Sequence, residues 1–250
     1  MSIFKEEKWN SPNGYHISML SCVEETDESI LLCVRGFGGG KYSLIIEEIA
    51  ETIKPAGAGT ISFTWPAHGD SDADGDMLLF DNCMRDLETV VSRIRRQWPQ
   101  KKLYCLATSF GGYMTVHYHS RHPEEFAHII LRSPAVQMAD VVWSFLDEDQ
   151  KRRAQSGEKL DFGFGENVLR LGISFYDSLK AHPIEDAAVA VPEKFSIIQG
   201  DQDEVVPPED VRIFAEHNHI PIWWVEGADH QYRNPGGKEQ VIAYIRQFFA

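Results

Sequence analysis

The stretch LYCLATSFGGYM, residues 103–114, places a serine between an apolar run and a pair of glycines. The apolar run predicts a buried strand, and the residues after the glycines predict a helix. A serine on such a sharp turn has its hydroxyl lifted out of the sheet, which suits a nucleophile. The alternative role for Ser109 is to cap the helix that follows it. The usual signature is Gly-x-Ser-x-Gly, and Ala107 occupies its first position, so this stretch alone leaves both roles open.

Short apolar runs alternate with amphipathic ones along the rest of the chain. Continuous apolar runs between helical patterns are typical of strands buried on both faces. The predicted fold class is therefore α/β, with a mainly parallel central sheet and helices on both faces. The first run, at 15–23, alternates more strictly and predicts an antiparallel edge strand. The other strands are expected at 29–36, 59–65, 102–108, 128–134, 194–200 and 220–227, and the helices at 43–54, 78–98, 111–122, 208–218 and 238–249.

One segment, from residue 137 to 182, breaks this alternation with helical and aromatic stretches and no clean strand. It follows a predicted strand, at the sheet edge where ligands bind in open α/β folds. We expect a core of residues 1–136 and 183–250 with a small helical cap insertion at 137–182, the alternative being an ordinary group of packing helices. Its aromatic residues are more than surface helices need: Trp143, Phe145, Phe162, Phe164, Phe175 and Tyr176.

Composition narrows the class of protein. The 250 residues, 43% of them hydrophobic, suit one large α/β domain or two small ones. A net charge of −14 argues against nucleic acid or an anionic membrane surface as partner. The 4 cysteines form no CxxC pair, which indicates free thiols in a reducing compartment. No leader-like segment or membrane-length apolar run is present, so we expect a cytoplasmic protein without a membrane span, acting on a small molecule.

A serine nucleophile needs a base, and the base needs an acid that orients it. The last expected strand runs into ADHQY, which places His230 at the carboxyl edge of the sheet. The strand before it leads to Asp201, Asp203 and Glu204 at the same edge. Each residue alone fits an ordinary solvated loop. Their joint occurrence in the order Ser, Asp, His is the order expected for this type of sheet, and it favours a catalytic triad.

The glycine-rich stretch RGFGGGK, residues 35–41, allows three interpretations. A dinucleotide fingerprint needs its third glycine elsewhere, and a phosphate loop needs Ser or Thr where Tyr42 follows the lysine. The third interpretation is an oxyanion loop, in which the Phe37 amide joins that of Phe110 to hold developing negative charge. We favour this role because it completes the same site and requires no phosphate.

Two further patterns suggest metal binding only weakly. The stretch at 70–81 copies the start of a calcium loop, but it lacks the preceding helix and has Asp81 where a glutamate is usual. Four histidines crowd one region without a completing ligand set, so they are expected at the surface: His117, His119, His122 and His128. We therefore predict no metal and no cofactor. The adjacent Trp223 and Trp224 are expected in the core, on opposite faces of their strand.

Five motifs, RGFGG, WPAHGDS, ATSFGG, GDQDEVVP and EGADHQY, together resemble the α/β-hydrolase superfamily. The resemblance is strongest to its short-capped esterases, the monoacylglycerol-lipase-like and cinnamoyl- or feruloyl-esterase-like proteins, and it covers about residues 15–249. It implies an α/β-hydrolase fold and a full set of reacting groups. These are Ser109 as nucleophile, Asp203 as acid, His230 as general base, and Phe37 and Phe110 as oxyanion residues.

The sequence departs from the family pattern around the site. Arg35 precedes Gly36 where the family has histidine, Ala107 and Thr108 replace Gly-His before the serine, and Thr64 and Ala67 replace the Asp and Gly of an Asp-x-x-Gly-His-Gly loop. None of these changes removes a reacting group.

The resemblance thus implies a serine hydrolase that cleaves carboxylic esters of small to medium acyl groups, aromatic ones included, through an acyl-enzyme. Arg35 either anchors the structure or holds a substrate carboxylate, and Trp143, Phe145 and Phe175 are candidate substrate contacts. The alternatives are a peptidase, thioesterase or acyltransferase with the same triad, or a non-catalytic ligand-binding protein of this fold.

Overall fold

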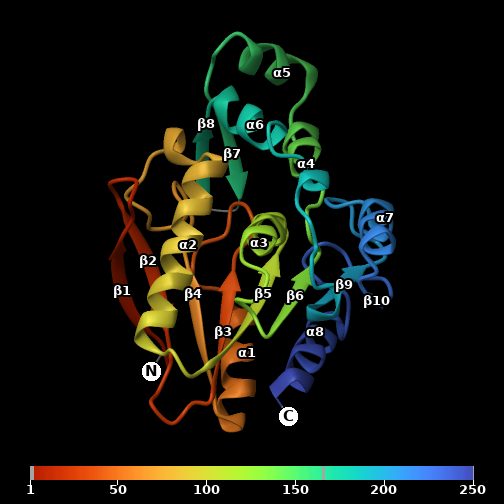
Figure 1. The fold of residues 1–250 in the computed structure, drawn as a ribbon. Coiled ribbons are helices and arrows are strands. Elements are labelled where there is room, and N and C mark those ends of the chain that lie inside the picture. Colours follow the sequence, from red (N-terminus) through yellow and green to blue (C-terminus); the bar gives the residue numbers. More distant parts are fainter. Residues whose placement is uncertain (1–2, 165–166, 250) are drawn as a thin grey trace.

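A computed structural model describes residues 3–164 and 167–249 of the chain. Its centre is an eight-stranded sheet in the order β1-β2-β4-β3-β5-β6-β9-β10, in which the strands from β4 to β10 run parallel (Figure 1). The predicted fold class is confirmed. The strands are β1 Lys5–Asn10, β2 His16–Ser21, β3 Ser29–Val34, β4 Ala58–Phe63, β5 Lys102–Thr108, β6 His128–Arg132, β9 Phe195–Gly200 and β10 Ile222–Val225.

The first predicted strand is antiparallel, as expected, but it is not the edge of the sheet. Strand β2 pairs antiparallel with β4 on one side and with β1 on the other. Strand β1 itself was not predicted, because its sequence KEEKWN is mostly charged and only Trp9 is buried. Exposed charges on an edge strand are a common protection against edge-to-edge association.

Helices cover both faces of the sheet, since alternate residues of each parallel strand point to opposite sides. In β3, Ile30 packs in the core layer under α2, α3 and α7, while Leu31 packs in the layer under α1 and α8. These helices are α1 Leu44–Ile53, α2 Phe80–Gln97, α3 Phe110–Arg121, α7 Pro208–Asn218 and α8 Gly237–Arg246. Among the described residues, none of the helices combines the length and the apolar character that crossing a membrane requires.

The segment from residue 138 to 180 lies beyond the carboxyl ends of β3, β5 and β6 (Figure 1). It contains α4 Met138–Ser144, α5 Glu148–Gln155 and α6 Ile173–Lys180, and also an antiparallel hairpin of β7 Leu160–Phe164 and β8 Asn167–Leu171. The expectation of a strand-free insertion was therefore wrong. The burial of β7 alternates, so the period-two pattern of LDFGF was a missed signal.

Local sequence explains why α4 and α5 are separate helices. Asp147 closes a capping box with Gln150, so α5 begins there and does not continue from α4.

Short 3-10 helices lie elsewhere in the described chain: η1 Lys54–Ala56, η2 Gly75–Met77, η3 Ile184–Asp186, η4 Pro192–Lys194 and η5 Gln247–Phe249.

Three side-chain placements correct expectations from the sequence. His117 and His119 are buried, not at the surface, because α3 packs between the sheet and other elements. Trp223 and Trp224 are 38% and 40% exposed, because β10 is an edge strand and not a central one. Trp223 finds a partner in Tyr244 of α8, with ring centroids 4.4 Å apart.

Candidate active site

Ser109 sits on a strained turn between β5 and α3. Its backbone angles, φ 51° and ψ −116°, lie in a region that side-chain-bearing residues rarely occupy. The turn is held from both sides, since the Ser109 N–H donates to the Arg132 carbonyl at 3.0 Å and its carbonyl accepts from Gly112 at 2.8 Å. A Cβ at Gly111 would lie 2.7 Å from the Arg35 carbonyl oxygen, so only glycine fits there. The surrounding chain therefore enforces this strained conformation, in which Ser109 is only 7% exposed but lines a cavity.

The glycine-rich loop after β3 packs directly against this turn. A Cβ on Gly36 would lie 3.2 Å from the Cβ of Ser109. A backbone bond from Gly39 N–H to Gly36 C=O, 3.3 Å long, closes a turn with Phe37 at its corner, where the N–H is not used by the turn. Phe110 is the first residue of α3, so its N–H has no acceptor within the helix. Two backbone donors thus flank the serine.

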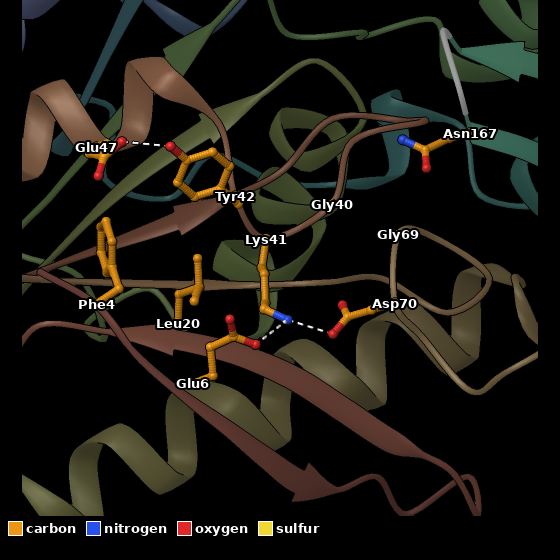
Figure 2. A pocket seen from close by; sticks show the side chains of 10 residues that line it. All are labelled: Phe4, Glu6, Leu20, Gly40, Lys41, Tyr42, Glu47, Gly69, Asp70 and Asn167. Atoms are coloured by element: carbon orange, nitrogen blue, oxygen red, sulfur yellow. Dashed lines mark hydrogen bonds and ion pairs between the residues drawn. The ribbon is translucent and has the colours of Figure 1, made fainter. Parts of the chain in front are cut away.

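The base of the same loop is anchored by Lys41, whose side chain is 8% exposed. Its Nζ donates to Ser18 Oγ at 2.8 Å and to Asp70 Oδ2 at 2.5 Å. Figure 2 shows this ammonium between Asp70 and the more exposed Glu6, on the wall of a second cavity of about 730 Å³. The walls of this 730 Å³ cavity include none of the predicted reacting groups, and Lys41 is already paired there. The role that fits Lys41 is therefore to hold the loop.

Asp203 and His230 lie at the carboxyl ends of β9 and β10 and contact each other directly. His230 Nδ1 is 2.8 Å from Asp203 Oδ2. The other carboxylate oxygen accepts the N–H groups of Val205 and Val206, at 3.0 and 2.8 Å. Burial opposes ionisation of Asp203, but the bonds from His230 and from these backbone amides outweigh it and lower its pKa.

The two neighbouring acids that the sequence left open have other partners. Asp201 accepts the Gly227 N–H at 2.6 Å. Glu204 is exposed and lies 3.7 Å from Arg233. Of the three candidates, Asp203 is the one placed against the imidazole.

A cavity of about 450 Å³ is lined by several of the predicted site residues, while Asp203 and Phe110 lie behind its described walls, next to His230 and Ser109. Its walls include Ser109, His230, Phe37, Arg35, Arg132 and Phe164. Two of these were not predicted as site residues. Arg132 ends the apolar strand β6 with a charge at the ligand-binding edge, which was a usable signal. Phe164 was noted only as one aromatic residue among several.

The three aromatic residues predicted to contact substrate lie outside the walls of this cavity. Phe175 is buried and stacks on Phe37, with ring centroids 5.4 Å apart. Trp143 packs on Tyr176 at 4.4 Å. Phe145 is 39% exposed. Phe175 thus joins this segment to the glycine-rich loop and Trp143 joins α4 to α6, since buried aromatic area stabilises such contacts.

Comparisons with known proteins agree with this architecture. A protein of Agrobacterium vitis S4 superposes with a TM-score of 0.82 at 15% identity over 99% of both chains. Est1E of Butyrivibrio proteoclasticus, solved with bound ferulic acid, gives 0.78 at 18% identity over 97% of both chains. The alpha/beta hydrolase domain-containing protein 10 of mouse gives 0.77 at 16% identity over 98% of both. No curated protein sequence matches the chain.

A family model described as serine aminopeptidase, S33, matches residues 27–160. The matched region exceeds half of the 250 residues and contains the glycine-rich loop and the Ser109 turn. The chain therefore belongs to this family of hydrolases, within the α/β-hydrolase superfamily.

Proposed function

We propose that the protein is a serine hydrolase that cleaves carboxylic esters through an acyl-enzyme. The observation that carries the proposal is the shared cavity, whose walls include Ser109 on its strained turn and His230, itself paired with Asp203. In this mechanism the Nε2 of His230 takes the proton of the Ser109 hydroxyl as the oxygen attacks the ester carbonyl. The proton then passes to the departing alcohol, and a water molecule, activated in the same way, releases the acid and restores the serine.

The carbonyl oxygen becomes negatively charged during each attack and needs donors. The N–H groups of Phe37 and Phe110 flank the serine and suit this role. Loss of one such donor typically costs about 3 kcal/mol of transition-state stabilisation. Asp203 holds the imidazole in the orientation and tautomer that leaves Nε2 free to accept the proton.

An ester is favoured over the N-terminus of a peptide, despite the family's name. An aminopeptidase has to bind a protonated α-amine, which calls for a carboxylate near the nucleophile. The described walls of the cavity contain two arginines and no carboxylate. Such a wall repels an ammonium group.

The size and lining of the cavity support small to medium acyl groups, aromatic ones included. Phe37 and Phe164 are its aromatic walls, and their ring centroids are 5.0 Å apart. Est1E, a protein of the same fold, holds ferulic acid, an aromatic acid. Phe164 comes from the hairpin above the sheet, so we propose that the insertion at 137–182 acts as a cap over the core of 1–136 and 183–250.

A fluorophosphonate probe tests the nucleophile, because it labels only activated serines. Mass spectrometry of the labelled protein is expected to find the probe on Ser109. Ser133 is an internal control, since it also follows a strand at positive φ, 44°, but is fully buried and bonded to Tyr232. Ser109→Ala is expected to abolish both labelling and the hydrolysis of p-nitrophenyl esters. Wild-type rates in Ser109→Ala would refute the proposal.

A further inference from the structure

Two arginine side chains lie side by side at the carboxyl edge of the sheet, next to the Ser109 turn. Val34 pairs with Ala107, so Arg35 follows β3 at the level of Thr108. Thr108 in turn pairs with Arg132. Arg35, Thr108 and Arg132 therefore form a row across three neighbouring strands and share a face. Both arginines line the cavity of Ser109 and His230, and both also line a small cavity beneath it, beside α1.

Neither guanidinium has a carboxylate partner among the described residues. Arg35 uses only its Nε, which donates to the Gly40 carbonyl at 2.9 Å. Arg132 is 8% exposed, and its buried Nε has no hydrogen-bond partner within the described chain. Its guanidinium stacks over the ring of Tyr232, 4.6 Å from the centroid. The two guanidinium groups carry ten N–H donors in all, and most of these are available to bind a ligand.

The nearest acids are committed elsewhere. Asp203 is bonded to His230, and Asp229 is paired with Arg233 at 2.5 Å. Burial lowers the pKa of Arg35 to about 10, and the neighbouring charge of Arg132 acts in the same direction. Burial also lowers the pKa of Arg132. Two adjacent cations held away from water, in a chain of net charge −14, are an unfavourable arrangement unless an anion completes it.

We propose that Arg35 and Arg132 form an anion subsite beside Ser109, so that the preferred ester substrates carry a second, anionic group of the carboxylate or phosphate type. The inference rests on the proposed function and narrows its substrate class. Guanidinium groups suit this role because their planar donors match two oxygens of such an anion at once. Arg35 lines the cavity and can keep its bond to Gly40 while its other N–H groups bind the anion. The ester carbonyl then lies at the serine while the anion lies on the arginines.

Three p-nitrophenyl esters of matched chain length test the subsite: the neutral valerate, the glutarate monoester and the 4-phosphonobutyrate. The wild type is expected to show a kcat/KM at least about tenfold higher for an anionic ester than for valerate. The carboxylate and phosphonate arms show which anion fits better. Arg132→Gln and Arg35→Gln are expected to lower this ratio by about tenfold or more. Arg233→Gln, at an exposed arginine outside the cavity, serves as the matched control and keeps the ratio.

A binding measurement separates failure of the subsite from failure of the proposed function. In the Ser109→Ala background, glutarate and inorganic phosphate are added separately, and at least one is expected to raise the melting temperature; adding Arg132→Gln is expected to abolish the rise. If Arg132→Gln does not fold, Arg132→Lys replaces it, and a smaller loss is expected because the charge remains. Stabilisation without any ester turnover would support the subsite and contradict the esterase. Turnover without an anion preference, or a preference unchanged in the arginine variants, overturns the subsite.

Discussion

The imidazole Nδ1 of His230 lies 2.8 Å from Oδ2 of Asp203, two residues that are 27 positions apart in the chain. The bond joins the loops after the last two strands of the sheet. Because the other carboxylate oxygen accepts two backbone N–H groups, the orientation of Asp203 does not depend on its bond to His230.

This geometry predicts the effect of Asp203→Asn. The amide presents an N–H to the imidazole in place of an acceptor, so the wrong tautomer is favoured and Nε2 no longer accepts the serine proton. We expect kcat for p-nitrophenyl esters to fall by about 10³- to 10⁴-fold. Asp201→Asn is the matched control, because the Asp201 carboxylate accepts a loop amide, as an asparagine oxygen also does. Equal activity of the two variants would remove Asp203 from the mechanism.

Gly111→Ala tests whether the Ser109 turn depends on close packing. The added methyl would press on the carbonyl oxygens of Val34 and Arg35, which are backbone and have little freedom to move. We expect a loss of unfolding free energy of about 1–3 kcal/mol, measured by urea denaturation. Gly163→Ala is the control, since a Cβ there meets no atom within 4 Å, and its stability is expected to stay close to that of the wild type.

The ion pair between Lys41 and Asp70 is expected to fix the position of the loop that bears Phe37. Lys41→Met removes the donors to Ser18 and Asp70, and we expect a loss of about 1–2 kcal/mol in stability together with a lower kcat, because the loop bearing Phe37 loses its anchor. Glu6→Gln removes the exposed partner of the same ammonium and is expected to cost less than about 1 kcal/mol. A Lys41→Met protein with wild-type kcat would show that the loop is positioned without it.

A pH dependence is expected from Asp86, a fully buried carboxyl bonded to Ser11, Asn13 and Tyr15. Burial raises its pKa to about 6, despite those bonds. The unfolded chain therefore holds this proton less tightly than the folded one. The contribution of Asp86 to the free energy of unfolding is full below pH ~4 and is lost as pH rises through ~6. The total change is about 3 kcal/mol.

Urea denaturation between pH 4 and 7 measures this effect in Asp86→Asn, which has no ionisable group at this position. The free energy of unfolding of the wild type, relative to that of Asp86→Asn, is expected to fall as pH rises from 4 to 7. Asp161→Asn, at an exposed carboxylate, is the control. A constant difference between wild type and Asp86→Asn across the range would contradict the assignment.

The sequence predicts the central fold well because buried parallel strands leave an unmistakable signal. Apolar residues fill β3 from Ile30 to Val34 and β5 from Leu103 to Ala107, so the place of both strands in the sheet follows from hydrophobicity. Strand β1 could not be recognised in this way, because four of its six residues are charged and its pairing depends on contacts with β2 that are formed only on folding. The alternation in β7 is present in LDFGF but spans only five residues, which is why the hairpin β7–β8 was not expected.

Some residues of the candidate site could likewise be predicted from the sequence, and others could not. Ser109, Asp203 and His230 each follow a strand, and the carboxyl ends of parallel strands share an edge, so their proximity could be inferred. The row of Arg35 and Arg132 depends on the strand register, which fixes which side chains share a face and which the sequence does not specify. The position of Phe164 depends on the hairpin itself, which is why the sequence favoured Trp143, Phe145 and Phe175 as substrate contacts and not Phe164.

The contact between Phe164 and the glycine-rich loop has a consequence for engineering. Gly38 adopts φ +79°, and a Cβ built on it would meet the ring of Phe164. The roof of the cavity thus rests on the same short loop that carries a proposed oxyanion donor. Under the proposed function, transplanting a foreign segment in place of residues 138–180 is expected to disturb that donor unless positions 38 and 164 are chosen together, so substrate preference and rate are expected to change together.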